Sequence, residues 1–151
     1  MKNDALPTKL AKEPMIDATC EVRFSSDVPA SAVVPGMLFT KLGNVSNIEP
    51  LPASQLPVQI RSSDPQFEFA ALSRLTWGNF LILVSDKSVA IGCKMPYPGW
   101  AVFREAIVKV VGLLSELPFI TAIERHSINH TVLLPAFVFF WRLRRGQRDR
   151  T

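Results

Sequence analysis

The two histidines, His126 and His130, are the first candidates for chemistry. An H-x3-H spacing on a helix would bring two metal ligands to one face. Residues 121–134 have the pattern of a strand, however, in which positions i and i+4 lie about 13 Å apart. No glutamate follows His126, and no third ligand is evident. We therefore expect polar residues at a strand end, with no metal and no other cofactor.

The two cysteines, Cys20 and Cys93, would be either a nucleophile or a redox pair if they were reactive. Neither has a neighbouring histidine or a C-x-x-C partner, and both fall in apolar, strand-like contexts. Free cysteine in such contexts packs as a small hydrophobe. The sequence also carries no Gly-rich phosphate loop, no G-x-S-x-G and no zinc pattern, so we expect no catalytic residue and lean against an enzyme.

Mixed charges on predicted strands form a third candidate site. If they share one face of a sheet they make a polar cleft, and the arginines Arg23, Arg74 and Arg125 suit a carboxylate or a phosphate. The alternative is a solvated, cross-paired sheet face. The full set is Glu21, Arg23, Glu68, Arg74, Glu124 and Arg125.

The segment Pro96-Tyr97-Pro98-Gly99-Trp100 is a fourth candidate. Tyr97 and Trp100 can each combine apolar area with a hydrogen bond to a ligand. The alternative, which we favour, is a stiff strand-to-helix corner in which Trp100 is the first core residue of the following helix.

The net charge of +4 comes from the end of the chain. Five arginines and Asp149 lie in residues 142–151, which leaves 12 bases and 12 acids elsewhere. We expect residues 135–151 to be an apolar and basic C-terminal tail outside the fold, with association to a membrane surface or nucleic acid as its alternative role. Residues 1–14 read as a flexible lead-in without an apolar signal core, so we expect a cytoplasmic protein with no transmembrane segment.

Two amphipathic helices are predicted between the N-terminal residues 1–14 and the C-terminal tail. Residues 99–117 carry an apolar stripe at helical spacing, and Gly112 within them would allow a close approach to a sheet. Residues 30–42 form the other helix, with Pro35 marking where its regular part begins. The stripe of the longer helix comprises Trp100, Phe103, Ile107, Val110, Leu114 and Leu117.

Strands are predicted at 18–24, 58–61, 67–76, 80–84, 89–94 and within 119–134, with a Pro-rich loop over 45–57. The resulting fold is a single α+β domain over residues 15–134. It has a mostly antiparallel sheet in the order β-α-β-β-β-β-α-β, with two helices packed on one face.

Several segments also match a known pattern in the right order, across residues 13–129. They are residues 13–18 running into 20–24, 34–39, 56–57 with 60–65, 96–100 with Phe103, and Ile123-Glu124-Arg125. Together they resemble an uncharacterised, sporadically distributed family of bacterial proteins. The resemblance implies no activity, because the family has no established function. It implies that the chain is a truncated or frame-shifted copy. Members of the family continue into a second portion after the strand that holds Ile123-Glu124-Arg125, whereas in this chain the resemblance is lost from about His130 onward.

From these features we expect a non-enzymatic cytoplasmic interaction module that binds a protein partner or itself, in an accessory or defence-type system. The alternative is a small-ligand-binding protein or enzyme that uses Arg23, Arg74 and Arg125, with Tyr97 and Trp100 as further contacts.

Overall fold

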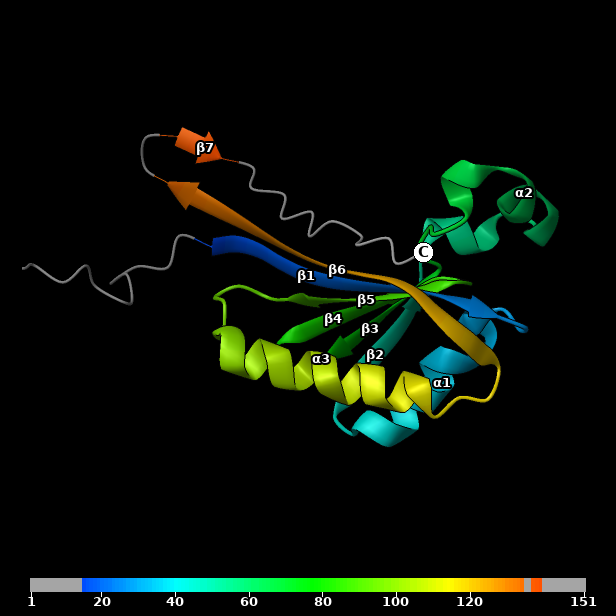
Figure 1. Ribbon diagram of the computed structural model, residues 1–151, viewed down its shortest axis with the longest axis horizontal. Helices are drawn as coiled ribbons and strands as arrows, with labels where there is room; N and C mark the ends of the chain where they lie inside the picture. The colour runs from blue at the N-terminus through cyan, green and yellow to red at the C-terminus, as the bar shows by residue number, and fades with distance from the viewer. Residues whose placement is uncertain (1–14, 135–136, 140–151) are drawn as a thin grey trace, which may run out of the picture.

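The computed structural model describes residues 15–134 and 137–139 (Figure 1). The helices are α1 (Ala30–Leu42), α2 (Val58–Ser63) and α3 (Trp100–Ser115), with short 3-10 turns η1 (Pro52–Gln55) and η2 (Pro65–Phe67). The strands are β1 (Met15–Ser26), β2 (Val45–Pro50), β3 (Ser73–Trp77), β4 (Phe80–Val84), β5 (Ser88–Cys93), β6 (Ile120–Leu134) and β7 (Phe137–Phe139).

The strands form one seven-stranded sheet in the order β2-β3-β4-β5-β1-β6-β7, and each neighbouring pair is antiparallel. Helices α1 and α3 lie together on one side of it, while the segment that contains α2 lies apart from them (Figure 1). The predicted α+β fold with a mostly antiparallel sheet and two helices on one face is confirmed. Apart from α2, the 3-10 turns and β7, the elements follow the predicted order β-α-β-β-β-β-α-β, with β2 in the place of the strand expected at 58–61.

The core lies between the sheet and these two helices. Alternation in β1 turns Ala18, Cys20, Val22 and Phe24 toward the helices, where all four are buried. Strands β4 and β5 contribute to the same layer, and α1 and α3 close it from the other side. The helix contribution is Ala30, Val34, Leu38, Leu42, Phe103, Ala106, Val110 and Leu114.

The predictions between residues 45 and 76 were wrong in detail. The expected Pro-rich loop contains strand β2, which pairs with β3 from Val45 to Pro50. The expected strand at 58–61 is the short helix α2, whose apolar residues Val58 and Ile60 stay exposed. The expected strand at 67–76 begins only at Ser73, because residues 65–67 form the turn η2.

Helix α1 begins at Ala30 and not at Pro35, so the proline lies inside the helix. The start of the helix is fixed from outside, because the Ala30 amide donates to the Asp86 carbonyl at 3.0 Å. Proline at position 35 removes one helical hydrogen bond. Burial of Ala30, Val34, Leu38 and Leu42 along one stripe offsets that loss.

Helix α3 has the predicted stripe with one correction. Phe103, Val110 and Leu114 are buried, whereas Trp100 is 47% exposed and is not a core residue. The helix begins at Trp100, directly after Gly99 with φ 99°, a conformation that favours glycine. The buried line therefore runs through Phe103, Ala106 and Val110, and the first-turn tryptophan lies on the flank of the helix.

Gly112 does not mark a close approach to the sheet. It is exposed, and a Cβ built on it meets no atom within 4 Å. We expect Gly112→Ala to raise the free energy of unfolding by about 0.5–1 kcal/mol, because alanine costs less backbone entropy in a helix. Urea unfolding followed by circular dichroism would measure this gain. A loss of stability would mean that this turn of α3 touches another part of the molecule.

Candidate interaction surface

Strand β6 is the part of the sheet that the helices leave uncovered. From Ile120 to His130 none of its side chains is buried, although its neighbour β1 supplies four buried ones. Residues directly opposite one another on antiparallel strands share a face. The buried side chains of β1 are paired with Ile123, His126, Ile128 and His130, so these four lie on the helix side of β6.

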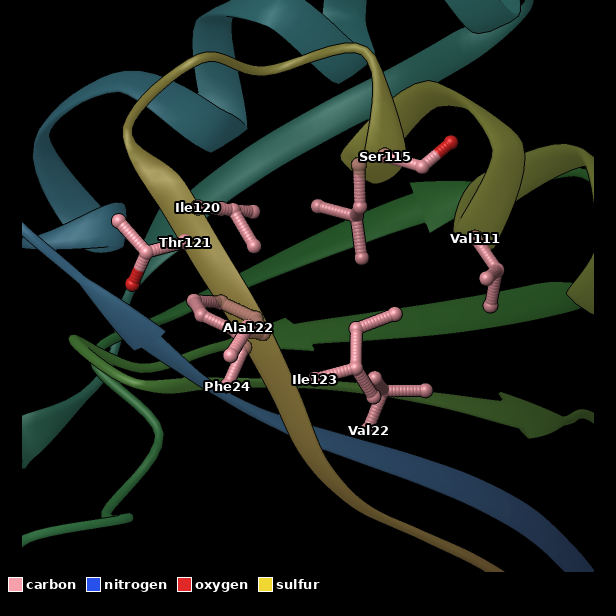
Figure 2. Close-up of a pocket in the computed structure, with 9 residues that line it drawn as sticks. Val22, Phe24, Val111, Ser115, Ile120, Thr121, Ala122 and Ile123 are labelled. Carbon is pink, nitrogen blue, oxygen red and sulfur yellow. The ribbon is translucent and has the colours of Figure 1, made fainter.

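An apolar cavity of about 160 Å³ opens between β6 and the C-terminal half of α3. Figure 2 shows Ile120 and Ile123 of β6 on one side of it and Val111 and Ser115 of α3 on the other. The rest of the lining comes from Val22 and Phe24 of β1, Leu114 of α3, and Thr121 and Ala122 of β6. Ile123 at its rim is 50% exposed, which is a large exposed fraction for a residue beside an apolar cavity.

A cluster of four rings lies at the other end of α3. His130 of β6 has its ring centre 6.2 Å from those of Tyr97 and Trp100 and 6.3 Å from that of Phe103, each in an edge-to-face arrangement. The His130 Nε2 atom is buried and has no hydrogen-bond partner among the residues that the structure describes. The structure thus brings the two aromatic candidates Tyr97 and Trp100 together with a histidine from a distant part of the chain.

We use the name α3–β6 groove for the apolar cavity together with the surface that leads from it to the ring cluster. One wall is the flank of α3 that carries Trp100, Ile107 and Val111, and the other is the helix side of β6. Ile107, Val111, Ile120 and Ile128 are partly buried against the core, so the groove is mostly apolar, with the exposed His126 between Ile123 and Ile128 on its β6 side.

The outer edge of β6 is also open. On one side β6 pairs with β1 from Met15 to Ser26, whereas on the other side, among the described residues, it pairs only through Val132–Leu134 with β7. Strand β7 falls in the segment expected to form the tail, and the rest of that segment and the expected lead-in 1–14 lie outside the described residues. Edge strands of this kind offer unpaired backbone groups to another polypeptide.

The polar side of the sheet carries the three candidate arginines, and it brings two of them together. Arg23 of β1 lies directly opposite Arg125 of β6. The Arg23 guanidinium lies 3.9 Å from the ring centre of Phe69, and its Nε is 3.3 Å from Glu21 Oε1 without hydrogen-bond geometry. Arg125 is exposed and has no ion pair among the described residues, and the adjacent Glu124 accepts a hydrogen bond from Ser25.

Arg74 does not join that pair. It lies on β3, separated from β1 by β4 and β5, which places it about 14 Å away across the sheet. Its guanidinium is paired with Glu49 directly across on β2. Most of this face therefore consists of paired charges, which is typical of a solvated sheet face.

A second, polar cavity of about 220 Å³ lies where the segment of α2 meets the turn between β4 and β5. On its wall Arg61 Nη1 lies 3.4 Å from Asp86 Oδ2, and Lys87 Nζ lies 3.3 Å from Glu68 Oε1. Asp86 also accepts a hydrogen bond from the Ser31 hydroxyl of α1. Asp86 thus ties the α2 segment and the start of α1 to the same turn.

The cysteines are in strands, as expected, and neither is activated. Burial raises the pKa of the Cys20 thiol from 9.0 to about 11, and the Glu21 carboxylate adds to the effect. Burial also raises the pKa of the Cys93 thiol to about 11, with a smaller contribution from the Asp17 carboxylate. Both remain protonated and poorly nucleophilic at neutral pH.

We expect native protein at pH 8 to react with iodoacetamide far more slowly than urea-unfolded protein, as read by mass spectrometry. Because the folded pKa values lie above the unfolded value, the thiols stabilise the fold below pH 9, and this contribution is lost as the pH rises toward 11. Fast labelling of native Cys20 would contradict its burial, and Cys20→Ser and Cys93→Ser variants would assign the signals.

The described residues contain no group of three metal-ligating side chains. None of the described helices is long and apolar enough to cross a membrane. Comparison of the chain with protein-family models, with curated proteins and with solved structures gives no match in any of the three.

Sequence reasoning missed the groove residues Ile123 and Val111 and placed His130 at a strand end. The signal for Ile123 was present, because it is an apolar residue in a long final strand with only two predicted helices to cover the sheet. The signal for His130 was absent, because its contact with Trp100 depends on the register between β1 and β6.

Proposed function

We propose that this protein is a non-enzymatic interaction module that binds a segment of another polypeptide in the α3–β6 groove. The observation that carries the proposal is the uncovered helix side of β6, where Ile123 stands half exposed beside an apolar cavity. Contiguous apolar surface of this kind is typical of protein-binding sites.

Three further observations support a binding role. Trp100 and Tyr97 are the residue types that most often anchor interfaces, and they lie at one end of the groove. The described residues hold no metal-ligand group, and their cysteines have raised pKa values. In keeping with the family resemblance, we place the protein in a bacterial cytoplasm, as part of an accessory or defence-type system.

A photo-crosslinking amino acid placed at position 123 in the full-length protein tests this function in the cells that produce it. We expect a discrete adduct from position 123 and none from position 102, since Val102 is 47% exposed on the opposite flank of α3. The Trp100→Asp substitution should remove the adduct at 123. Equal labelling from the two positions, or no adduct at 123, would rule out the groove as the binding surface.

The ligand-binding alternative rests on Arg23 and Arg125 alone, because Arg74 is separated from them and paired with Glu49. We rank it second, since Arg23 already has Glu21 and Phe69 as neighbours. The alternative of membrane-surface or nucleic-acid association involves residues outside the described part of the chain.

A further inference from the structure

We propose that the occupant of the α3–β6 groove is an amphipathic α-helix of a partner protein, with acidic residues beside its apolar stripe. The inference rests on the proposed function and names the chemistry of the partner.

The first argument is the width of the helical layer. A helix with its side chains is about 10–12 Å wide, and neighbouring strands lie about 4.8 Å apart. One helix therefore covers about two strands, and α1 and α3 together cover about four strands of this wider sheet. Packed helices lie about 8–10 Å apart, so a third helix beside α3 would lie over β6.

The second argument is the lining of the groove. The facing flank of α3 carries Trp100, Ile107 and Val111, and β6 presents Ile123 and Ile128. Apart from His126 of β6, the side chains named for the two walls are apolar, and the neighbouring α3 is 16 residues long. A helix with an apolar stripe buries its backbone polar groups within itself, so it can fill an apolar trough of this length without leaving them unpaired.

The third argument is charge. Arg104 lies on the same flank of α3 as Val111, is exposed, and has no ion pair among the described residues. His126 is exposed on the helix side of β6. Glu124 is turned to the opposite face, where it accepts the hydrogen bond from Ser25. Arg104 is therefore a positive charge without an ion pair among the described residues at the rim of the groove, and an acidic residue on the partner would complement it.

Two other occupants fit less well. A strand added to the edge of β6 would meet the register shift between Ile123 and Arg125 and the charges of Glu124 and Arg125, and both features disfavour edge pairing. A second copy of the chain offers only α2 as a free helix among its described residues, because α1 and α3 bury their apolar stripes on their own sheet. With six residues, α2 is too short to fill a groove beside the 16-residue α3, although its Val58 and Ile60 are exposed.

A displayed peptide library distinguishes these cases. It contains 16-residue peptides with apolar residues at helical spacing and an equal number with strict alternation, all randomised at the polar positions, and is selected on the full-length protein. We expect helical-pattern peptides with Asp or Glu beside the stripe to be enriched. The Ile123→Asp substitution should weaken the binding of these peptides about tenfold or more, and Val102→Asp should weaken it less than about twofold. Arg104→Glu should weaken acidic peptides about threefold, unlike the control Lys41→Glu.

Each outcome decides between the proposals. If peptides with the alternating pattern are enriched and Ile123→Asp weakens their binding, the partner segment is not a helix. That outcome would overturn the further inference and leave the proposed function, an interaction module, in place. If no selected peptide responds to Ile123→Asp, both proposals fail. Sedimentation of the protein alone completes the test, because a dimer that Ile123→Asp dissociates would identify a second copy as the occupant and overturn the partner helix.

Discussion

Phe103→Ala is expected to lower the free energy of unfolding by about 3–5 kcal/mol, the typical loss for a large aromatic residue removed from a core. Phe103 is fully buried, and its ring lies 6.3 Å from that of Phe80 in a stacked arrangement. It also contacts the rings of Tyr97, Trp100 and His130. Its removal leaves a cavity under the first turn of α3, between Phe80 of β4 and His130 of β6. Urea unfolding followed by near-ultraviolet circular dichroism measures the loss.

Trp100→Ala is the matched control on the same helix. Trp100 contacts two rings of the cluster but is 47% exposed, so we expect its truncation to cost only about 1 kcal/mol. Equal losses for the two variants would contradict this assignment and would return Trp100 to the core. A small loss leaves Trp100 available as an interface anchor at the end of the α3–β6 groove.

Local patterns were enough to predict the elements that use one face consistently. Alternation in β1 and the apolar run of β4 correctly identified both strands, and the stripe of α3 correctly identified the helix. The position of Trp100 was beyond this reasoning. An apolar stripe in a sequence is wide enough to include the flank of a helix, and only the packing of the helix on the sheet decides which residues of the stripe are buried.

Residues 45–63 were mispredicted because their structure depends on tertiary contacts. Only Val45 of β2 is buried, so β2 has no alternating pattern and exists because β3 pairs with it. Val58 and Ile60 are β-branched and favour a strand, yet α2 leaves both exposed. Among the described residues, α2 forms one ion pair with the rest of the fold, between Arg61 and Asp86.

The candidate site was predictable as a list of residue types and not as an arrangement. Arg23 and Arg125 meet only because β1 and β6 pair in a register that includes shifts, and a shift of one residue would place them on opposite faces. The α3–β6 groove could not be predicted from the sequence at all. It results from a mismatch between the width of the sheet and the number of helices, which no local pattern records.

Asp86→Ala is expected to lower the free energy of unfolding by about 2–3 kcal/mol, because it leaves a largely buried guanidinium without its anion. The Arg61 side chain is 12% exposed and that of Asp86 is 25% exposed, so water replaces the lost partner poorly. The variant also removes the acceptor of the Ser31 hydroxyl at the start of α1. Hydrogen exchange should accelerate in residues 51–72, which Asp86 ties to the β4–β5 turn.

The control is Glu49→Ala, which breaks the exposed pair with Arg74 and should cost less than about 1 kcal/mol. A second variant separates loss of the ion pair from loss of the aspartate itself. Adding Arg61→Met to Asp86→Ala removes the buried charge together with its partner, so we expect this double variant to be more stable than Asp86→Ala alone. If the double variant is instead less stable, the guanidinium of Arg61 does not need Asp86, and the loss in the single variant comes from the start of α1.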